Sequence, residues 1–393
     1  MEIAGFRFAG MACGIKKAGG KDLALVVADR PVSTAALFTQ NQVKAAPVRI
    51  ASARLASGRA QAILVNSGNA NACTGRAGIE AALRASAAIA EKLAIDPSAV
   101  LPASTGVIGE PLPVEKIESA AESLVSGLSS SAEAFAEAIL TTDRGRKVAE
   151  ASYESSDGRK LRLLGIAKGA GMIHPNMATT LAFVFTDATV EPELLRSMLG
   201  AAGDATFGRI SVDGDTSTSD MLALMASGAA GAAPIEAGSA DEQAFRRALE
   251  EVLQHLALAI VADGEGAEHL VELRVSGLAS DEDALKVART IATSLLSKTA
   301  LFGRDPNWGR FLAAAGRAGV QFDSEQAEIF IGDVAVVREG VDLGPNSTDR
   351  AKAEMGKARY AITLRLGQGP GKAHYYTCDI GSEYLRINAG YRT

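Results

Sequence analysis

The sequence contains few cysteines and few aromatic residues. Among its 393 residues there are 3 cysteines, Cys13, Cys73 and Cys378, and aromatic residues make up 5%. Because the cysteines are odd in number, far apart and in no Cys-x-x-Cys pair, the sequence encodes neither a disulfide framework nor a zinc cage. A reducing, cytoplasmic compartment is therefore expected. The shortage of aromatic side chains also disfavours a stacking platform for bases or sugars.

An excess of positive charge and long apolar runs are also lacking. Lys and Arg number 40 against 46 Asp and Glu, giving a formal net charge of −6, so there is no basic footprint for nucleic acid or an anionic membrane. The uncharged, apolar-leaning stretch 221–235 is rich in Gly and Ala and is shorter than the roughly 20 residues of a membrane helix. The amino terminus has neither the apolar core of a signal peptide nor the Arg/Ser-rich pattern of a mitochondrial presequence. A soluble, unexported protein that binds small molecules or other proteins is predicted.

Several common catalytic and cofactor motifs are missing. No G-x-S-x-G elbow occurs, and GAGMIH at residues 169–174 lacks the third glycine of a dinucleotide-binding fingerprint. The segment GQGPGK (367–372) is one residue short of a phosphate loop and has no hydroxyl residue after its lysine, so a hairpin turn between two strands is predicted there. No metal site is expected, because the four histidines have no metal-like spacing: His174, His255, His269 and His374.

The hydrophobic pattern predicts a mixed α/β protein. Short apolar runs typical of strands alternate with Ala-rich amphipathic segments typical of helices. Strands are expected near residues 23–28, 62–66, 161–166, 181–186, 269–275 and 360–366. Helices are expected near residues 79–93, 114–128, 191–202, 242–261 and 283–297, the fourth capped by the Ser239 segment. No linker and no repeat divides the chain, so a single intertwined architecture is predicted.

The most unusual local sequence is KGAGMIHPNMATTLAFVF, at residues 168–185. A loop this rich in glycine can hold strained backbone, and Thr179 lies where the loop becomes an apolar strand. On one interpretation Thr179 is only a β-branched residue at a strand edge. On the other it is a nucleophile that attacks the preceding carbonyl and cuts the Ala178–Thr179 bond by an N→O acyl shift. The α-amine then exposed titrates near pH ~8 and can act as general base for the threonine hydroxyl, with no histidine required.

Eight motifs, in this order along the chain, carry a resemblance to a known family. They are NSGNANACTG (66–75), STGVIG (104–109), TTD (141–143), KGAGMIHPNMAT (168–179), VDGDTST (212–218), DGEGA (263–267), KTALFGRDPNWGR (298–310) and RINAGYRT (386–393). With them the sequence resembles the ornithine acetyltransferase (glutamate N-acetyltransferase, ArgJ) family of arginine biosynthesis, from Gly5 to the last residue. The resemblance favours the nucleophile interpretation of Thr179.

The resemblance implies a role for each residue that matches the family's motifs. Thr179 is similar to the self-cleaving threonine, which then carries the acetyl group as an ester. Cleavage after Ala178 would leave an α fragment, 1–178, and a β fragment, 179–393, intertwined in one globule. Thr105 and Gly106 match the pair that forms the oxyanion hole.

The substrate-binding positions of the family are matched as well. The substrate is an amino acid with a carboxylate and, for ornithine, a terminal ammonium, so its pocket needs both charges. Lys168 matches the binding lysine and is expected to hold the carboxylate, while Glu265 matches the binding glutamate and is expected to meet the ammonium. The other matching positions are Thr142, Asn388 and Thr393.

The implied fold is α/β, a multilayer αββα-type sandwich of the self-cleaving ArgJ/DmpA-like class, with the fragments paired as an α2β2 heterotetramer. The implied reaction moves the acetyl group of N2-acetylornithine to glutamate without a cofactor. A bifunctional form would also accept acetyl-CoA as co-substrate. One alternative is a self-processed N-terminal-nucleophile amidohydrolase or aminopeptidase, which would release free acetate without glutamate. A second is an uncleaved, non-enzymatic binding protein on the same scaffold.

The sequence departs from the family's pattern at two places. Thr180 follows Thr179 where the family more often has methionine, so two adjacent hydroxyls compete for the role of nucleophile. Thr179 is preferred because it follows the Met-Ala pair. The segment Arg144-Gly145-Arg146 after TTD also differs from the commoner pattern, which weakens the assignment of Thr142.

Overall fold

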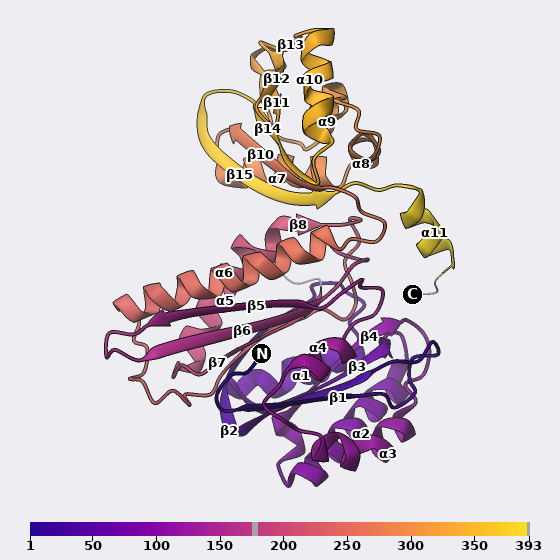
Figure 1. Cartoon of the computed structure of the whole chain (residues 1–393), viewed down its shortest axis with the longest axis vertical. Coiled ribbons are helices and arrows are strands. Elements are labelled where there is room, and N and C mark those ends of the chain that lie inside the picture. The colour runs from indigo at the N-terminus through magenta and orange to yellow at the C-terminus, as the bar shows by residue number, and fades with distance from the viewer. Residues whose placement is uncertain (175–179, 391–393) are drawn as a thin grey trace.

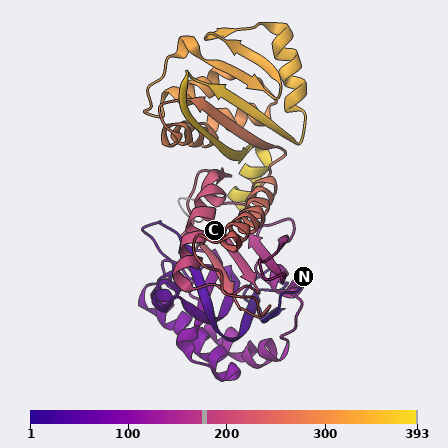
Figure 2. The same ribbon diagram turned by 90° about the vertical axis from the view of Figure 1, so that its left-hand side faces the viewer.

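The structure is a computed structural model that describes residues 1–174 and 180–390. It is mixed α/β, with two sheets and helices packed around them. Figures 1 and 2 show two lobes: a larger layered lobe that holds the first sheet, and a smaller carboxy-terminal lobe built around the second.

The first sheet has eight strands among the residues described. Seven follow the order β4-β3-β2-β9-β7-β6-β5, and β1 pairs with β2. The strands are β1 (Phe6–Met11), β2 (Leu23–Phe38), β3 (Arg59–Asn69), β4 (Val100–Val107), β5 (Lys147–Glu154), β6 (Lys160–Lys168), β7 (Leu181–Thr186) and β9 (Met221–Ala226). The long strand β2 pairs along its first part with β1 and β3 and along its second part with β9. It therefore belongs to both halves of the sheet, which lie as two layers in Figure 1.

Alternation of side chains along the strands produces four layers. Val26 and Ile63 share a buried core with Phe183 of β7, so this core lies between the two halves of the sheet. Their strand neighbours Leu25 and Leu64 belong to the core under α2 (Gly75–Leu93) and α3 (Val114–Ser126). On the far side, β6, β7 and β9 share a core with α5 (Pro192–Ala205) and α6 (Ala240–Ala262). Because successive strand residues point to opposite faces, the layer order is αββα, as expected from the family resemblance.

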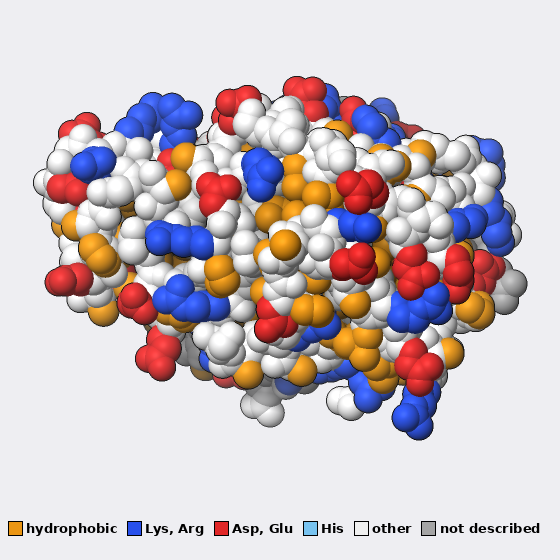
Figure 3. Space-filling view, turned by 90° about the horizontal axis from the view of Figure 1, so that it is seen from below, with side chains coloured by type: hydrophobic (Ala, Val, Ile, Leu, Met, Phe, Trp, Pro, Cys, Tyr) orange, Lys and Arg blue, Asp and Glu red, His pale blue; other side chains and the backbone are white. Residues whose placement is uncertain are grey.

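Two shorter helices complete this lobe: α1 (Ala46–Arg54) and α4 (Glu133–Ala138). Phe135 of α4 packs edge-on against Phe8, Phe183 and Phe185 in the core between the sheet halves. On the face seen in Figure 3, acidic and basic side chains are interspersed.

The second sheet builds the carboxy-terminal lobe, with the strand order β13-β12-β11-β14-β10-β15-β8. Its strands are β8 (Ile210–Ser211), β10 (Leu270–Gly277), β11 (Glu328–Ile331), β12 (Val334–Arg338), β13 (Val341–Asp342), β14 (Arg359–Arg365) and β15 (Gly369–Cys378). Its helices are α7 (Asp281–Ala292), α8 (Leu295–Phe302), α9 (Trp308–Gly316) and α10 (Pro345–Met355). The last helix of the chain, α11 (Ser382–Gly390), leaves this lobe and returns toward the sandwich (Figure 1).

Most elements predicted from the sequence are confirmed. The six expected strands correspond to β2, β3, β6, β7, β10 and β14, and four of the five helices to α2, α3, α5 and α6. Ser239 caps α6 by accepting the backbone N–H of Glu242 at 3.0 Å. The expected helix 283–297 is wrong in its second half: α7 ends at Ala292, and Ser294 caps a new helix, α8.

The predicted hairpin at GQGPGK is also wrong. Strand β14 pairs in parallel with β10, and β15 pairs antiparallel with the other edge of β10. The segment 367–372 therefore crosses over β10 and enters β15, so it does not join two adjacent strands. No helix in the described ranges is long and apolar enough to cross a membrane.

Candidate active site

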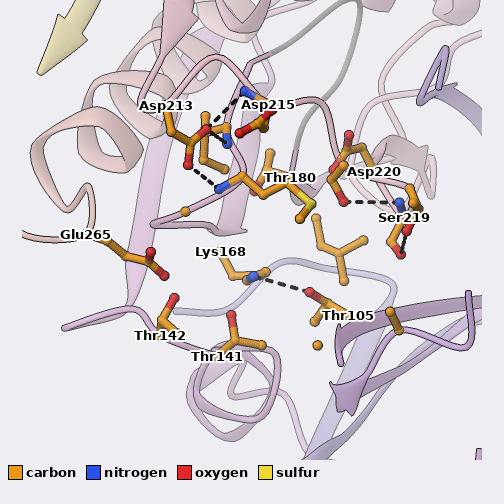
Figure 4. A pocket seen from close by; sticks show the side chains of 18 of the residues that line it. Thr105, Thr141, Thr142, Lys168, Thr180, Asp213, Asp215, Ser219, Asp220 and Glu265 are labelled. Atoms are coloured by element: carbon orange, nitrogen blue, oxygen red, sulfur yellow. Dashed lines mark hydrogen bonds between the residues drawn. The ribbon is translucent and has the colours of Figure 1, made fainter. Parts of the chain in front are cut away.

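A cavity of about 210 Å³ brings together six of the residues predicted from the sequence. It is lined, among others, by Thr105, Gly106, Thr142, Lys168, Glu265 and Asn388. Figure 4 shows several of these side chains around one space. Ala178, Thr179 and Thr393 lie outside the described residues. Thr180, the next residue after Thr179, also lines the cavity.

Thr105 and Gly106 lie near the end of β4, where that strand pairs in parallel with β3. Gly106 has φ +129°, and a Cβ placed on it would lie 2.4 Å from the backbone carbon of Gly68 on β3. Only glycine permits this approach of the two strands. The close pairing fixes the backbone of this segment at the cavity wall, which the side chain of Thr105 also lines.

Lys168 ends β6 and is 8% exposed. Its Nζ donates to Thr105 Oγ1 at 3.2 Å. Burial lowers the pKa of Lys168 from 10.5, and this effect is opposed by the nearby carboxylate of Asp143. An ammonium has three donors, and a single hydrogen-bond acceptor for Lys168 occurs among the described residues. The remaining donors are available to an anionic group that enters the cavity.

Asp143 belongs to the TTD motif, although the sequence alone indicates no role for it. In the structure its carboxylate is a nearby opposite charge for Lys168. Its Oδ1 accepts from the backbone N–H of Gly169 and from Lys147 Nζ, both at 2.6 Å. Lys147 Nζ also lies 2.6 Å from Asp263 Oδ2. Burial alone would raise the pKa of Asp143, but Lys168, Lys147 and the hydrogen bonds outweigh it and hold the pKa at about 2. The carboxylate is therefore charged and ties the TTD loop to the residue after Lys168.

Glu265 follows α6 and faces the same cavity. Its backbone N–H donates to Ala170 O at 2.9 Å, and its carboxylate accepts from Asn388 Nδ2 of α11 at 2.8 Å. A Cβ on Gly171 would lie 2.5 Å from Glu265 Cδ, so the glycine makes room for this side chain. The carboxylate is 7% exposed and is held between the glycine-rich loop and the last helix.

Asp213, in the motif VDGDTST, fixes the described part of the glycine-rich loop. Its carboxylate accepts the backbone N–H groups of Met172 and Ile173 at 2.6 and 2.9 Å, and Tyr384 of α11 donates to it at 3.4 Å. Burial raises the pKa of Asp213, while hydrogen bonds from backbone N–H groups oppose that rise. The motif is part of the family resemblance, but nothing in the sequence indicates that Asp213 holds the glycine-rich loop.

The two departures from the family's pattern lie in different surroundings. Thr180 Oγ1 is buried and has no hydrogen-bond partner in residues 1–174 and 180–390, so a second hydroxyl remains at the cavity wall. Arg144 binds Asp263 Oδ1 at 2.9 Å and the carbonyl of Ala262, and its side chain is 62% exposed. The unusual segment after TTD thus lies at the surface, while Thr142 lines the cavity.

The cavity places a cation and an anion beside hydroxyl and glycine residues of its wall. Lys168 and Glu265 present opposite charges to one small space, which suits a ligand with a carboxylate and an ammonium. Thr105 and Gly106 lie in its wall, which Leu181 at the start of β7 also lines. Figure 4 shows Thr105 and Thr180 at the same space. No group of three His, Cys, Asp or Glu side chains that could hold a metal ion occurs in the described parts of the chain.

Comparison with known proteins gives matches over the whole chain. The profile of the ArgJ family matches residues 7–393. The Arginine biosynthesis bifunctional protein ArgJ of Geobacter sulfurreducens is 47% identical over 394 residues, with 100% of both chains covered. The protein of the same name from Desulfotalea psychrophila is 48% identical, again with 100% of both covered. A crystal structure of Arginine biosynthesis bifunctional protein argJ from Bacillus halodurans is 40% identical, with a TM-score of 0.51, and the match covers 53% of this chain and 98% of that chain.

Proposed function

The chain belongs to the ArgJ family, and we propose that it is the acetyltransferase of arginine biosynthesis that moves the acetyl group of N2-acetylornithine to glutamate. The observation that carries this proposal is the cavity in which Lys168 and Glu265 present opposite charges next to Thr105 and Gly106. A hydrolase alternative has no comparable support, since the full-length relatives described above carry the ArgJ name.

In the first half-reaction Thr179 Oγ attacks the acetyl carbon of N2-acetylornithine. The threonine α-amine takes the hydroxyl proton as the C–O bond forms, and it passes the proton to the leaving nitrogen as the C–N bond of the tetrahedral intermediate breaks. Thr105 and Gly106 stabilise the oxyanion, and each such donor is worth roughly 3 kcal/mol in the transition state. Lys168 holds the substrate carboxylate and Glu265 its terminal ammonium. Thr142, Asn388 and Thr393 provide further substrate contacts.

In the second half-reaction the amine of glutamate attacks the acetyl-threonine ester. A C–N bond forms, the ester C–O bond breaks, and the proton lost by the amine returns to the threonine oxygen. Water competes with glutamate for the same ester, so transfer requires a closed site. The glycine-rich loop and α11 form walls that keep water out. Asp213 hydrogen-bonds to both of these segments, and Glu265 holds α11 through Asn388. No cofactor is needed for either step.

Self-cleavage between Ala178 and Thr179 is part of the proposal. The bond lies in the connection between β6 and β7, which are adjacent antiparallel strands, so both fragments would share the first sheet after cleavage. Residues 169–173 are held by Asp143, Asp213 and Glu265. The solved ArgJ chain from Bacillus halodurans supports cleavage, because a match over 98% of its length covers only 53% of this chain.

The setting of the reaction follows from the same proposal. The fragments remain associated and pair as an α2β2 assembly, and the reaction takes place in the cytoplasm. The three cysteines are free in the structure, as a reducing compartment would keep them. Acetyl-CoA serves as a second acetyl donor, in keeping with the description of the relatives as bifunctional.

The test is the denatured mass of the purified protein beside two single variants, Thr179→Ala and Thr180→Ala. The wild type and Thr180→Ala are expected to give two species whose masses add up to the intact chain plus one water. Thr179→Ala is expected to give one species of 40.5 kDa. Cleavage that is lost in Thr180→Ala but kept in Thr179→Ala would assign the nucleophile to the other hydroxyl.

Activity of the cleaved protein is the second arm of the test. With N2-acetylornithine and glutamate, formation of ornithine and N-acetylglutamate in equal amounts is expected. Release of free acetate independent of glutamate would replace the proposal with the hydrolase alternative.

A further inference from the structure

A second cavity, of about 850 Å³, adjoins the active-site cavity and has no role in the reaction described above. Its lining includes Lys16, Lys17, Gly68, Glu110, Lys116 and Thr141. The two cavities share Thr141, and Val107 directly follows Gly106 in β4. A molecule could therefore occupy the larger cavity and extend a short arm to the Thr105–Gly106 segment.

The larger cavity is positively charged on a chain whose formal net charge is −6. Lys16, Lys17 and Lys116 line it, together with one carboxylate, Glu110. Lys16 Nζ donates to the carbonyl of Lys21 at 2.6 Å, and Lys116 Nζ donates to the carbonyl of Gly14. Lys17 Nζ lies 3.4 Å from Glu110 Oε1, with its side chain 87% exposed. Each ammonium has three donors, so these contacts leave donors on every lysine for an anionic ligand.

A buried carboxylate fixes the loop that carries two of these lysines. Asp22 is 0% exposed and accepts the backbone N–H groups of Cys13, Ile15 and Lys16 at 2.6, 2.6 and 2.9 Å. Since the loop is closed around Asp22, little ordering is needed when a ligand binds.

The same loop rests on the strand next to the oxyanion segment. Gly68 of β3 pairs with Gly106 of β4. Gly68 has φ +93°, and a Cβ on it would lie 2.8 Å from Lys16 Cγ. Burial lowers the pKa of Lys16; the charge of Asp22 opposes this shift, and the nearby charge of Lys168 adds to it. The positive charge of the larger cavity is thus close to the site of acyl transfer.

We infer that this cavity binds the phosphate groups of a thioester acetyl donor, such as acetyl-CoA, while the acetyl group reaches Thr105 and Gly106. The inference rests on the proposed function and adds a location for the second donor. The thioester would enter the same chemistry: Thr179 Oγ bonds to the acetyl carbon, the C–S bond breaks and the thiol leaves with the threonine proton. Glutamate then takes the acetyl group as before. Three ammonium groups suit a donor that carries several phosphate charges.

The test compares two thioesters as donors to glutamate, with the purified cleaved protein. Acetyl-CoA carries phosphates, and acetyl-pantetheine has the same thioester without them. In the wild type the KM for acetyl-CoA is expected to be the lower of the two. The double variant Lys17→Gln/Lys116→Gln is expected to raise the KM for acetyl-CoA about tenfold. This is the loss of affinity expected when two weak, solvent-exposed charge contacts are removed. The KM values for acetyl-pantetheine and N2-acetylornithine are expected to stay unchanged.

Three further variants distinguish a loss of ligand binding from an effect on folding alone. Glu110→Gln removes the single carboxylate of the cavity and is expected to lower the KM for acetyl-CoA, an effect opposite to that of the lysine variants. Lys92→Gln changes a partly exposed lysine of α2 that pairs with Glu91 and Glu122 outside the cavity, and no change is expected. The single variant Lys17→Gln, at a mostly exposed side chain, provides a version whose folding is not at risk.

Equal KM values for the two thioesters in the wild type, or an unchanged KM for acetyl-CoA in the lysine variants, would overturn the inference. A wild type that is active with N2-acetylornithine but inactive with acetyl-CoA would also overturn it and leave the proposed function standing. Inactivity with both donors would overturn the proposed function as well.

Discussion

Two lysines in different regions of the molecule are both buried but have different surroundings. Lys168 ends β6 at the active-site cavity, and Lys298 lies in α8 of the carboxy-terminal lobe; they are 8% and 1% exposed. Burial lowers the pKa of both. Lys298 Nζ donates to Thr377 Oγ1 at 2.8 Å and to the carbonyl of Cys378 at 2.7 Å, both buried, whereas Lys168 donates to Thr105 and faces a cavity.

The difference shows why burial and a lowered pKa do not by themselves identify a functional lysine. Both residues belong to motifs shared with the family, KGAGMIHPNMAT and KTALFGRDPNWGR. Lys298 has fixed acceptors on β15, so its charge is used to hold α8 against the sheet. Lys168 keeps donors for a ligand, so part of its hydrogen-bonding capacity is not used by the fold.

The largest expected effect concerns the counterion of the active-site lysines. Asp143→Ala leaves Lys147 with one carboxylate in place of two and removes the acidic neighbour of Lys168. Breaking a buried ion pair from one side costs about 3–5 kcal/mol, and this loss is expected in the free energy of unfolding measured with urea. Glu137→Ala, at the exposed partner of Lys21, serves as the control with little change. A loss below about 1 kcal/mol for Asp143→Ala would show that the cavity does not need this carboxylate to remain folded.

Lys168→Met is expected to separate activity from stability. The variant removes the cation that holds the substrate carboxylate, and loss of a charged hydrogen bond of about 3 kcal/mol corresponds to a fall of about 100-fold in kcat/KM. The free energy of unfolding is expected to change little, because the desolvation cost of Lys168 is removed while Asp143 keeps Lys147 and the N–H of Gly169 as partners. Steady-state kinetics and urea unfolding of the same preparation provide both values. Normal kinetics would remove Lys168 from substrate binding.

Lys298→Met is the matched variant in the other region, and the opposite pattern is expected. The hydroxyl of Thr377 and the carbonyl of Cys378 lose a donor in the interior, which costs about 1–3 kcal/mol of stability. The kcat of the folded fraction is expected to remain near that of the wild type. A variant with unchanged stability but reduced kcat would contradict the structural role of Lys298 and remove the contrast between the two lysines.

The sequence predicts the sandwich better than the carboxy-terminal lobe. Strands such as β2, β3 and β7 are apolar on both faces or alternate regularly, so their periodicity is visible locally. The crossing of GQGPGK over β10 depends on which strands pair, and this is determined by contacts far apart in sequence. The lobe itself has no linker of distinct composition before β10, so the chain gives no local sign of a boundary there.

Site residues that belong to recognisable motifs are predicted from the sequence. Residues whose role depends on how they are buried in the fold are not. Thr105, Lys168 and Glu265 were found through resemblance alone, and the structure brings them to one cavity. Lys147 begins β5 on the same face as Ala149, Ala151 and Tyr153, so the alternation indicates an inward position for it but not the partners of its charge. Its burial follows from the packing of Asp143 and Asp263 around it, and no local pattern encodes that arrangement.

The smallest expected effect is a difference in pH dependence between the two lysines. For each, the folded protein has a pKa below the 10.5 of an exposed lysine, so between the two values the unfolded chain binds more protons. Stability contributed by either lysine is therefore expected to rise with pH through that window. Catalysis responds at Lys168 alone: as pH rises through its lowered pKa the ammonium is lost, and the KM for N2-acetylornithine rises by about tenfold per pH unit above it.

Profiles of KM against pH for the wild type, Lys168→Arg and Lys298→Met test this difference. The substrates titrate equally in all three proteins, so only a change between proteins reports on the enzyme. Lys168→Arg is expected to remove the alkaline rise in KM, because a guanidinium keeps its charge up to a pKa above about 12. Lys298→Met is expected to retain the rise, since its ammonium contacts Thr377 and Cys378 and no substrate. If the alkaline rise in KM persisted in Lys168→Arg and disappeared in Lys298→Met, the titration that affects substrate binding would belong to Lys298 and not to Lys168.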